Sequence, residues 1–178
     1  MLAATRLTVA LGLAVALTAA HAAKDGERRA GDVLSLALPV GVLAAEAWRG
    51  DGEGAWQLVQ TFALSAGITE VLKKNTGVTR PDGSDDKSFP SGHAARAFSA
   101  AAYVHQRHGW DTAWPLYAVA TYVGHTRVQT RRHRWSEVAV AAGLSYGIAR
   151  WRVTPVGTTV AVSPQSDGGL MLSLHMPL

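Results

Sequence analysis

The sequence of 178 residues contains no cysteine, which excludes a disulfide framework and a metal site built from thiolates. It also lacks an H-E-x-x-H motif and any cluster of carboxylates, so no metal site is indicated. There is no internal repeat, and no low-complexity segment apart from a bias toward alanine. The mean hydropathy is only +0.07, lower than a chain built mostly of spanning helices would show. We therefore expect one domain with its own core, with or without a processed segment.

Charge is unevenly distributed along the chain. The formal net charge is only +4, but the stretch from Glu70 to Arg134 holds ten Lys/Arg against five Asp/Glu. A basic centre in a small protein favours an anionic ligand, such as a phosphate, or an anionic surface.

The N-terminal residues have the composition of an export signal. Arg6 precedes an apolar run over residues 7–17, and Ala20-His21-Ala22 fits an A-x-A cleavage pattern. The pattern predicts a signal peptide over residues 1–22. The alternative is an uncleaved first membrane helix over residues 7–23, which is just long enough to span. Both interpretations place the rest of the chain outside the cytoplasm.

Beyond this segment, apolar periodicity and turn residues predict a helical domain over residues 23–154. The expected helices cover residues 32–48, 55–74, 92–107, 112–127 and 136–152, and residues 75–90 form a loop. We expect Asp32 to be an N-cap and Pro39 to kink its helix. Two β-like runs flank "QSDGG" and predict a hairpin within residues 155–178. The fold class is thus all-α, a helical bundle with a short C-terminal β-hairpin.

The stretch "KSFPSGHAARAF", residues 87–98, places polar residues at the mouth of a predicted helix. Ser91 is a good N-cap, and Gly92 leaves backbone amides uncovered. First-turn N–H groups and the helix dipole form an anion site. His93 then lies where it can donate a proton to a bound anion. Taken alone, the stretch fits a capped helix with a solvated histidine equally well.

Two further segments bring the residue types that bind and attack phosphate. "KKNTGVTRP" contributes Lys73 and Arg80, a point charge and a bidentate fork for phosphate oxygens. "HTRVQTRRHRWSEV" contributes Arg127, His133 and Glu137. A carboxylate four residues after a histidine can hold one tautomer and make the ring a better nucleophile.

Together, these three segments resemble the type-2 phosphatidic acid phosphatase and vanadium haloperoxidase superfamily. Its motif K-x6-R-P matches Lys73 to Pro81, P-S-G-H matches Pro90 to His93, and S-R-x5-H-x3-D matches the segment from Thr126 to Glu137. The match covers roughly residues 55–152 in the expected order. Three spaced motifs are highly specific, whereas P-S-G-H alone is weak.

The resemblance implies a role for each matched residue. His133 attacks phosphorus and becomes a phosphohistidine, while His93 protonates the leaving oxygen and then activates water. The phosphoryl oxygens are held by five groups, from Lys73, Arg80, Ser91, Gly92 and Arg127. No metal or other cofactor takes part in this chemistry.

Two positions depart from the family pattern. Thr126 stands where serine is usual, which is a conservative change, and Glu137 stands where aspartate is usual. The extra methylene of Glu137 alters its reach toward His133. The alternative interpretation is that Glu137 only favours a helix N-terminus beside Ser136.

The function that these features predict is a metal-independent phosphatase acting on a lipid phosphate, or on a related monoester or diphosphate, outside the cytoplasm. The alternatives are a vanadate-dependent haloperoxidase and a degenerate module that only binds phosphate or lipid. The expected partners are a phosphorylated lipid or small phosphate ester and a membrane surface, and no nucleic acid.

Other polar and aromatic residues have less specific expectations. His105 and His108, beside Arg107, are expected to be solvated, and His125 to lie outside the site. Arg131, Arg132 and Arg134 fit either headgroup contact or a solvated loop. The six tryptophans fall near predicted helix ends, which suits a membrane-interface belt as well as caps on a small core.

Overall fold

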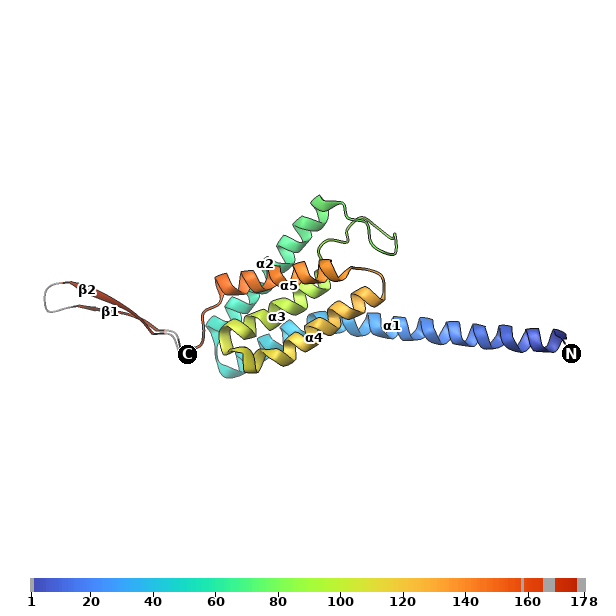
Figure 1. Ribbon diagram of the computed structural model, residues 1–178. Coiled ribbons are helices and arrows are strands. Elements are labelled where there is room, and N and C mark those ends of the chain that lie inside the picture. The colour runs from blue at the N-terminus through green and yellow to red at the C-terminus, as the bar shows by residue number, and fades with distance from the viewer. Residues whose placement is uncertain (1, 158, 165–168, 176–178) are drawn as a thin grey trace.

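The computed structural model describes residues 2–157, 159–164 and 169–175. In the described residues, five helices precede two strands (Figure 1). They are α1 (Leu2–Arg49), α2 (Gly52–Thr76), α3 (Gly92–His108), α4 (Trp110–Gln129), α5 (Trp135–Arg152), β1 (Thr159–Pro164) and β2 (Leu170–His175). The predicted all-α class with a C-terminal hairpin is confirmed. The strands pair antiparallel, with Thr159 opposite His175, and the predicted turn at 165–168 lies outside the described residues.

The first helix differs from the expectation. Residues 2–49 form one continuous helix, so Asp32 lies inside it, and its prediction as an N-cap was wrong. Pro39 also lies inside α1 and does not end it. The N-terminal part of α1 projects away from the other helices, and the hairpin projects on the opposite side (Figure 1). The expected signal segment is thus continuous with a helix of the bundle.

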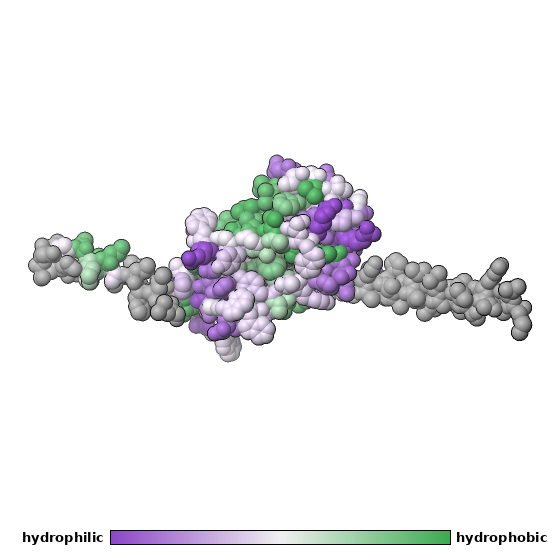
Figure 2. Space-filling model, in the orientation of Figure 1, coloured by the Kyte–Doolittle hydropathy of each residue, from purple (hydrophilic) through white to green (hydrophobic). Residues whose placement is uncertain are grey.

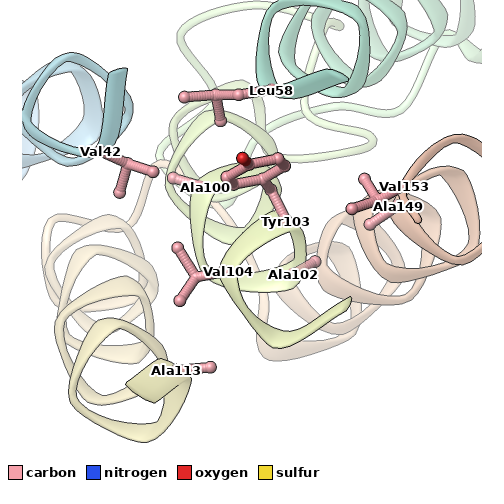
Figure 3. Packing of buried hydrophobic residues seen from close by; sticks show 9 residues of the cluster. All are labelled: Val42, Leu58, Ala100, Ala102, Tyr103, Val104, Ala113, Ala149 and Val153. Carbon is pink, nitrogen blue, oxygen red and sulfur yellow. The ribbon is translucent and has the colours of Figure 1, made fainter. Parts of the chain in front are cut away.

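Helix α3 lies at the centre of the bundle and contacts each of the other four helices. Its alanines at positions 94, 95, 97, 100, 101 and 102 are buried, as is Tyr103. A helix that is covered on all sides favours small residues, because they let neighbouring backbones approach closely. Figure 3 shows Tyr103 among Leu58 of α2, Val42 of α1 and Val153, which follows α5.

Successive helices run in opposite directions, which separates the bundle into two ends (Figure 1). The ends of α2 and α4 and the starts of α3 and α5 lie at one end, where the predicted site residues are. At the other end, Arg107 donates to both carboxylate oxygens of Asp51. There His108 also lies 2.6 Å from the buried carboxylate of Glu46.

The prediction that His105 and His108 are solvated was therefore wrong. Both are partly buried, and His105 contacts the Tyr117 hydroxyl at 3.3 Å. The sequence places them beside Arg107 at a helix end. His108, however, pairs with Glu46 near the end of α1, and His105 lies against the rings of Trp110, Tyr117 and Tyr146.

The surface is divided between hydrophobic and hydrophilic areas. Figure 2 shows hydrophobic residues across the middle of the helical body and hydrophilic residues near the loop that follows α2. Within the described residues, one stretch, Asp25–Arg49, is long and apolar enough to cross a membrane. Buried core helices and signal sequences meet the same criterion, so this finding alone does not assign a span.

Candidate active site

A cavity of about 490 Å³ opens at the end of the bundle that carries the three sequence motifs. Every helix except α5 contributes to its lining, together with the loops after α2 and α4. The polar lining residues are Arg28, Asp32, Thr69, Glu70, Lys73, Arg80, Asp85, Lys87, His93, Arg96, Arg127, Arg132 and His133. Seven of these are Lys or Arg and three are Asp or Glu, so the cavity favours anions.

His133 lies in the loop just before α5, with its side chain only 3% exposed. Its Nδ1 lies 2.9 Å from Oε2 of Glu137, in the first turn of α5. Its Nε2 lies 3.3 Å from Nη1 of Arg80. A guanidinium can only donate, so Nε2 accepts and the ring proton is on Nδ1, where it is donated to Glu137. This tautomer leaves the Nε2 lone pair on the cavity side.

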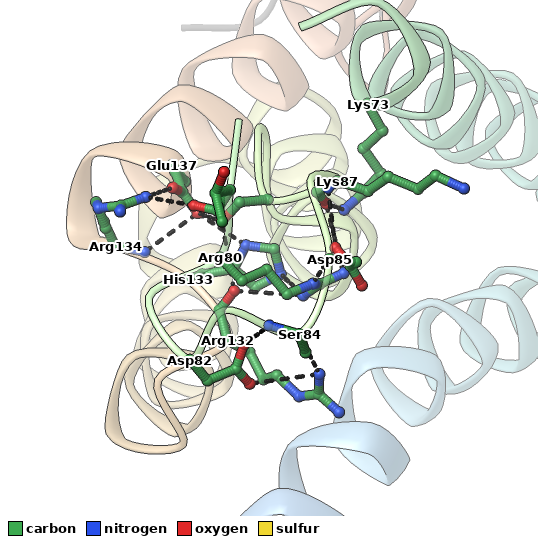
Figure 4. A network of polar contacts seen from close by, with 12 residues as sticks. Lys73, Arg80, Asp82, Ser84, Asp85, Lys87, Arg132, His133, Arg134 and Glu137 are labelled. Carbon is green, nitrogen blue, oxygen red and sulfur yellow. Dashed lines mark hydrogen bonds and ion pairs between the residues drawn. The ribbon is translucent and has the colours of Figure 1, made fainter. Parts of the chain in front are cut away.

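Glu137 is held by several donors at once (Figure 4). Its Oε2 accepts from the Ser88 hydroxyl at 2.6 Å and from the Arg134 backbone N–H at 3.2 Å, besides His133. Its Oε1 accepts from Nη1 of Arg134 at 2.9 Å. Burial alone would raise the pKa of Glu137, but the bonds from Ser88, His133 and Arg134 hold it below its usual value. Glu137 is therefore an ionised partner for His133.

This arrangement explains how a glutamate functions where the family pattern has aspartate. Helix α5 begins at Trp135, so His133 is outside it and is not a helical i, i+4 neighbour. The longer side chain spans the gap back to the histidine. Glu137 also accepts from the Arg134 N–H, so it makes both the contact expected for orienting His133 and the contact expected at a helix start.

The electrostatics of His133 suit a nucleophile. Burial lowers its pKa from 6.5 to about 4, and the bond to Glu137 only partly opposes this. The charges of Lys73 and Arg80 act in the same direction as burial. The ring is therefore neutral at pH 7, which a nitrogen nucleophile requires.

The P-S-G-H stretch forms the start of α3, as predicted. Ser91 is the N-cap, and its side chain accepts from the Ala94 N–H at 3.5 Å. Gly92 is the first helical residue and lines the cavity. The Ser91 N–H donates to the backbone oxygen of Glu137 at 3.3 Å, which ties the start of α3 to the start of α5.

His93 lies in the first turn of α3 and reaches the same cavity as His133. Burial lowers its pKa to about 4, and the charges of Arg127 and Arg96 add to this effect. Its side chain is 31% exposed, and Nε2 lies 2.8 Å from Oδ1 of Asp32 on α1. The two histidines thus share one space but have different partners.

The three predicted cations surround the cavity. Nε of Arg80 donates to Asp85 at 2.7 Å, and Nζ of Lys73 donates to the Lys87 backbone oxygen at 3.0 Å. The buried Arg127 donates to Asp32 at 2.7 Å. Burial and then the charge of Arg80 lower the pKa of Lys73. All eight residues singled out from the sequence thus lie in or directly behind one cavity.

Several contributors were not predicted from the sequence, among them Ser88, Arg96, Arg132 and Asp32. Ser88 bonds Glu137, Arg132 and Arg96 line the cavity, and Asp32 contacts both His93 and Arg127. Ser88 lies within the quoted stretch, two residues before Pro90, so proximity to the motif was an available signal. Asp32 carried no such signal, since it is far from the motifs in the sequence.

His125 and the remaining arginines of the third segment have distinct positions. His125 is not in the cavity lining and lies against the rings of Tyr122 and Trp135. Arg132 donates to Ser84 at 2.8 Å in the loop after α2. Arg134 donates to the Thr79 backbone oxygen at 3.1 Å in the same loop. These two arginines therefore tie the two loops around the cavity together.

Comparisons with known proteins agree with this geometry. The sequence profile of the PAP2 superfamily matches residues 54–159. The chain is 34% identical over 130 residues to a lipid A 4'-phosphatase of Helicobacter pylori, covering 67% of this chain and 65% of that protein. It is 36% identical over 120 residues to a lipid A 1-phosphatase of Porphyromonas gingivalis, covering 61% of this chain and 27% of that protein. The chain thus spans less than two thirds of either relative, and no solved structure matches it significantly.

The profile covers more than half of the chain and includes all three motifs, whose residues meet in one cation-lined cavity. The protein therefore belongs to the PAP2 superfamily.

Proposed function

We propose that this protein is a metal-independent phosphatase that hydrolyses a phosphorylated lipid outside the cytoplasm, through a phosphohistidine on His133. One observation carries the proposal. A neutral imidazole, fixed by a buried carboxylate, presents its unprotonated nitrogen to a cation-lined cavity that a second histidine also enters. The names of both relatives refer to phosphatases of a lipid.

In the first step, the phosphoryl oxygens bind Lys73, Arg80 and Arg127 and the N–H groups at the start of α3. Nε2 of His133 attacks phosphorus, and the bond from phosphorus to the leaving oxygen breaks. His93 gives its proton to that oxygen. Glu137 accepts the hydrogen bond from the Nδ1–H of His133 throughout, and it stabilises the positive charge that the His133 ring acquires.

In the second step, the neutral His93 takes a proton from water. The water oxygen attacks phosphorus, and the N–P bond to His133 breaks. Inorganic phosphate leaves, and both histidines return to their initial states. The net reaction is hydrolysis of one phosphate ester bond, with no external oxidant or reductant.

The cations around the cavity supply the charge stabilisation that a metal ion supplies in other phosphatases. Within the described part of the chain, no group of three or more His, Asp or Glu side chains is placed to hold a metal ion. The arginine and lysine side chains that line the cavity stabilise the developing negative charge.

An apolar groove between α1 and α2 supports a lipid substrate. The cavity takes residues 28 and 32 from α1 and residues 66–73 from α2. The groove has a volume of about 190 Å³. It begins about one turn away from these residues on each helix, toward the end of α1 and the start of α2. Its lining is entirely apolar: Leu36, Pro39, Val40, Leu43, Leu58, Val59, Phe62 and Ala63. A phosphate in the cavity would therefore direct a hydrocarbon chain into the groove.

Exposed aromatic residues support contact with a membrane surface. All six tryptophans are exposed, which disfavours the alternative that they cap the core. Tryptophan prefers the membrane–water interface, where an apolar ring and a polar N–H are both accommodated. Five of them lie near helix ends away from the cavity: Trp48, Trp56, Trp110, Trp114 and Trp151.

The location outside the cytoplasm rests on the N-terminal pattern and is tested separately. Cleavage near Ala22 gives a mature protein that begins close to residue 23, and N-terminal sequencing of the protein from its native envelope identifies that end. An intact Met1 would instead favour retention of the first helix as an integral membrane segment.

The activity test measures phosphate release by the purified full chain, with a chelator present. The substrates are p-nitrophenyl phosphate, phosphatidic acid and lipid A, the last because both relatives are named for it. We expect chelator-resistant hydrolysis that vanadate inhibits. Halide oxidation with vanadate and peroxide would indicate the haloperoxidase instead, and binding without turnover would indicate a non-catalytic module.

The groove has its own test with a matched control. Val40→Glu introduces a charge into the groove, whereas Val33→Glu introduces the same charge on the same helix, at an exposed position outside it. We expect Val40→Glu to raise KM at least tenfold for a long-chain phosphatidic acid and to leave p-nitrophenyl phosphate unaffected. Equal effects of the two variants would contradict the assignment of the groove to the lipid chain.

A further inference from the structure

Asp32 of α1 contacts two residues of the candidate site with a single oxygen. Its Oδ1 accepts from Nη1 of Arg127 at 2.7 Å and lies 2.8 Å from Nε2 of His93. Arg127 is further held by Arg28, whose backbone oxygen accepts from Nη2 at 2.6 Å. One side of the site is therefore built from α1, outside the three motifs and outside the matched residues 54–159.

The approach of α1 to α4 that permits these contacts depends on Gly31. A Cβ at this position would lie 2.1 Å from Oγ1 of Thr126 and 2.4 Å from Nη2 of Arg127. Both distances are far shorter than van der Waals contact allows. A glycine inside a helix is less stable than an alanine at the same position. Its position next to Asp32 is explained by the close contact that it allows between α1 and the start of the third motif.

The charges around His93 show why a carboxylate is needed there. The charged and titratable groups facing the cavity are Arg28 and Asp32 on α1, Glu70 and Lys73 on α2, Arg96 on α3, Arg127 on α4, and Arg80, Asp85, Lys87, Arg132 and His133 on the loops. Burial, Arg127 and Arg96 all disfavour a protonated His93, and Asp32 opposes them. A general acid must carry its proton before the leaving group departs.

We propose that Asp32 is a positioning residue of this site, which favours the protonated form of His93, orients its ring for proton transfer and anchors the Arg127 guanidinium. The inference rests on the proposed phosphatase activity. Asp32 acts through His93 and Arg127. Three of the five Arg127 N–H donors bond Thr126, Asp32 and Arg28, and the other two remain for a phosphate oxygen.

The test compares Asp32→Asn with Asp25→Asn in the full chain. Asp25 lies on the same helix, is exposed and is outside the cavity lining, so it controls for the lost charge. We expect Asp32→Asn to lower kcat about 10- to 100-fold for phosphatidic acid, whose alkoxide is a poor leaving group. The loss for p-nitrophenyl phosphate should be smaller, because nitrophenolate needs less protonation. Asp25→Asn should match the wild type for both substrates.

The pH profile distinguishes this role from a purely structural one. Asp32 favours the protonated form of His93, so its removal should move the alkaline limb of kcat to lower pH. Gly31→Ala retains every charge but pushes α1 away from Thr126, and it should move the limb in the same direction. In a His93→Ala background, Asp32→Asn should cause no further change in leaving-group dependence.

Three outcomes would overturn the proposal. An unshifted alkaline limb in a folded Asp32→Asn variant, checked by circular dichroism, would exclude the effect on His93. Equal losses for both substrates would do the same. Higher activity together with tighter vanadate inhibition would show that Asp32 competes with the phosphate for its cations. If the wild-type protein hydrolyses no substrate, the proposed function itself fails, and this result is distinct from all three.

Discussion

Among the described residues, two histidines pair with a buried carboxylate, one at each end of the bundle, and the two pairs differ in what surrounds them. At one end, His133 lies 2.9 Å from Glu137, and at the other, His108 lies 2.6 Å from Glu46. In both pairs the carboxylate is buried. The second nitrogen of His133, however, meets a guanidinium in a cavity lined by seven Lys/Arg. The cavity beside His108 is lined mainly by apolar residues, with Arg49 as its only Lys or Arg.

The difference shows that a buried histidine–carboxylate pair does not by itself make a site. The pair fixes a tautomer, and chemistry then requires a free nitrogen facing a place where an anion can bind. The pair at the His108 end secures the connection between α1, α2 and α3, as does the nearby Asp51–Arg107 pair at 2.6 Å.

The largest expected contrast is between the two histidines. His133→Ala should lower kcat by on the order of 10⁵-fold or more, the usual result of deleting a nucleophile, with the fold retained. His108→Gln should leave kcat close to the wild-type value and lower the melting temperature. Steady-state kinetics and thermal unfolding of both variants test this contrast. Near-normal turnover by folded His133→Ala would exclude it as the nucleophile.

Neutralising Glu137 and Glu46, the carboxylates of the two pairs, should give the next largest contrast in kcat. Glu137→Gln should lower kcat about 10³- to 10⁴-fold, as when the carboxylate of a catalytic triad becomes an amide. Glu137→Asp should also lose activity, because His133 lies outside α5 and the shorter chain no longer spans the gap. Glu46→Gln should cost about 1–3 kcal/mol of stability without affecting kcat. Wild-type turnover by Glu137→Gln would mean that His133 is oriented by another group.

His93 should give a smaller effect that depends on the substrate. His93→Ala should lower kcat about 10²- to 10⁴-fold for an alkyl phosphate, the usual contribution of general acid–base catalysis. The loss should shrink for p-nitrophenyl phosphate. Rates measured over a series of leaving groups test this. A loss that is the same across the series would indicate that His93 positions the phosphate rather than protonating the leaving oxygen.

The smallest effect is on stability and concerns the burial of His133. Its pKa falls from 6.5 to about 4 on folding, so between these values the unfolded chain binds a proton that the folded chain does not. The free energy of unfolding should therefore fall as the pH drops from 6.5 to 4, by roughly 3 kcal/mol for this group. Denaturant unfolding at pH 7 and pH 4.5 measures the loss, and His133→Gln should reduce it. An unchanged loss in that variant would assign the acid sensitivity to other groups.

The sequence predicted those parts of the molecule that depend on local pattern or on close spacing. Apolar periodicity located the five helices to within a few residues, apart from the extension of α1. The three motifs identified eight residues, of which six line one cavity while Ser91 and Glu137 lie directly behind it. The role of Asp32 was missed because its contacts with Arg127 cross 95 residues and depend on how α1 packs on α4. The His108–Glu46 pair crosses 62 residues and was missed for the same reason.

The position of Asp32 has a practical consequence for anyone shortening this protein. A fragment that starts at residue 54, where the match to the superfamily begins, would keep all three motifs but discard α1. It would lose the side of the cavity that holds Arg127 and one wall of the apolar groove. Removal of residues 1–22 alone would leave both in place. The shortest fragment worth expressing is therefore longer than the region that matches the superfamily.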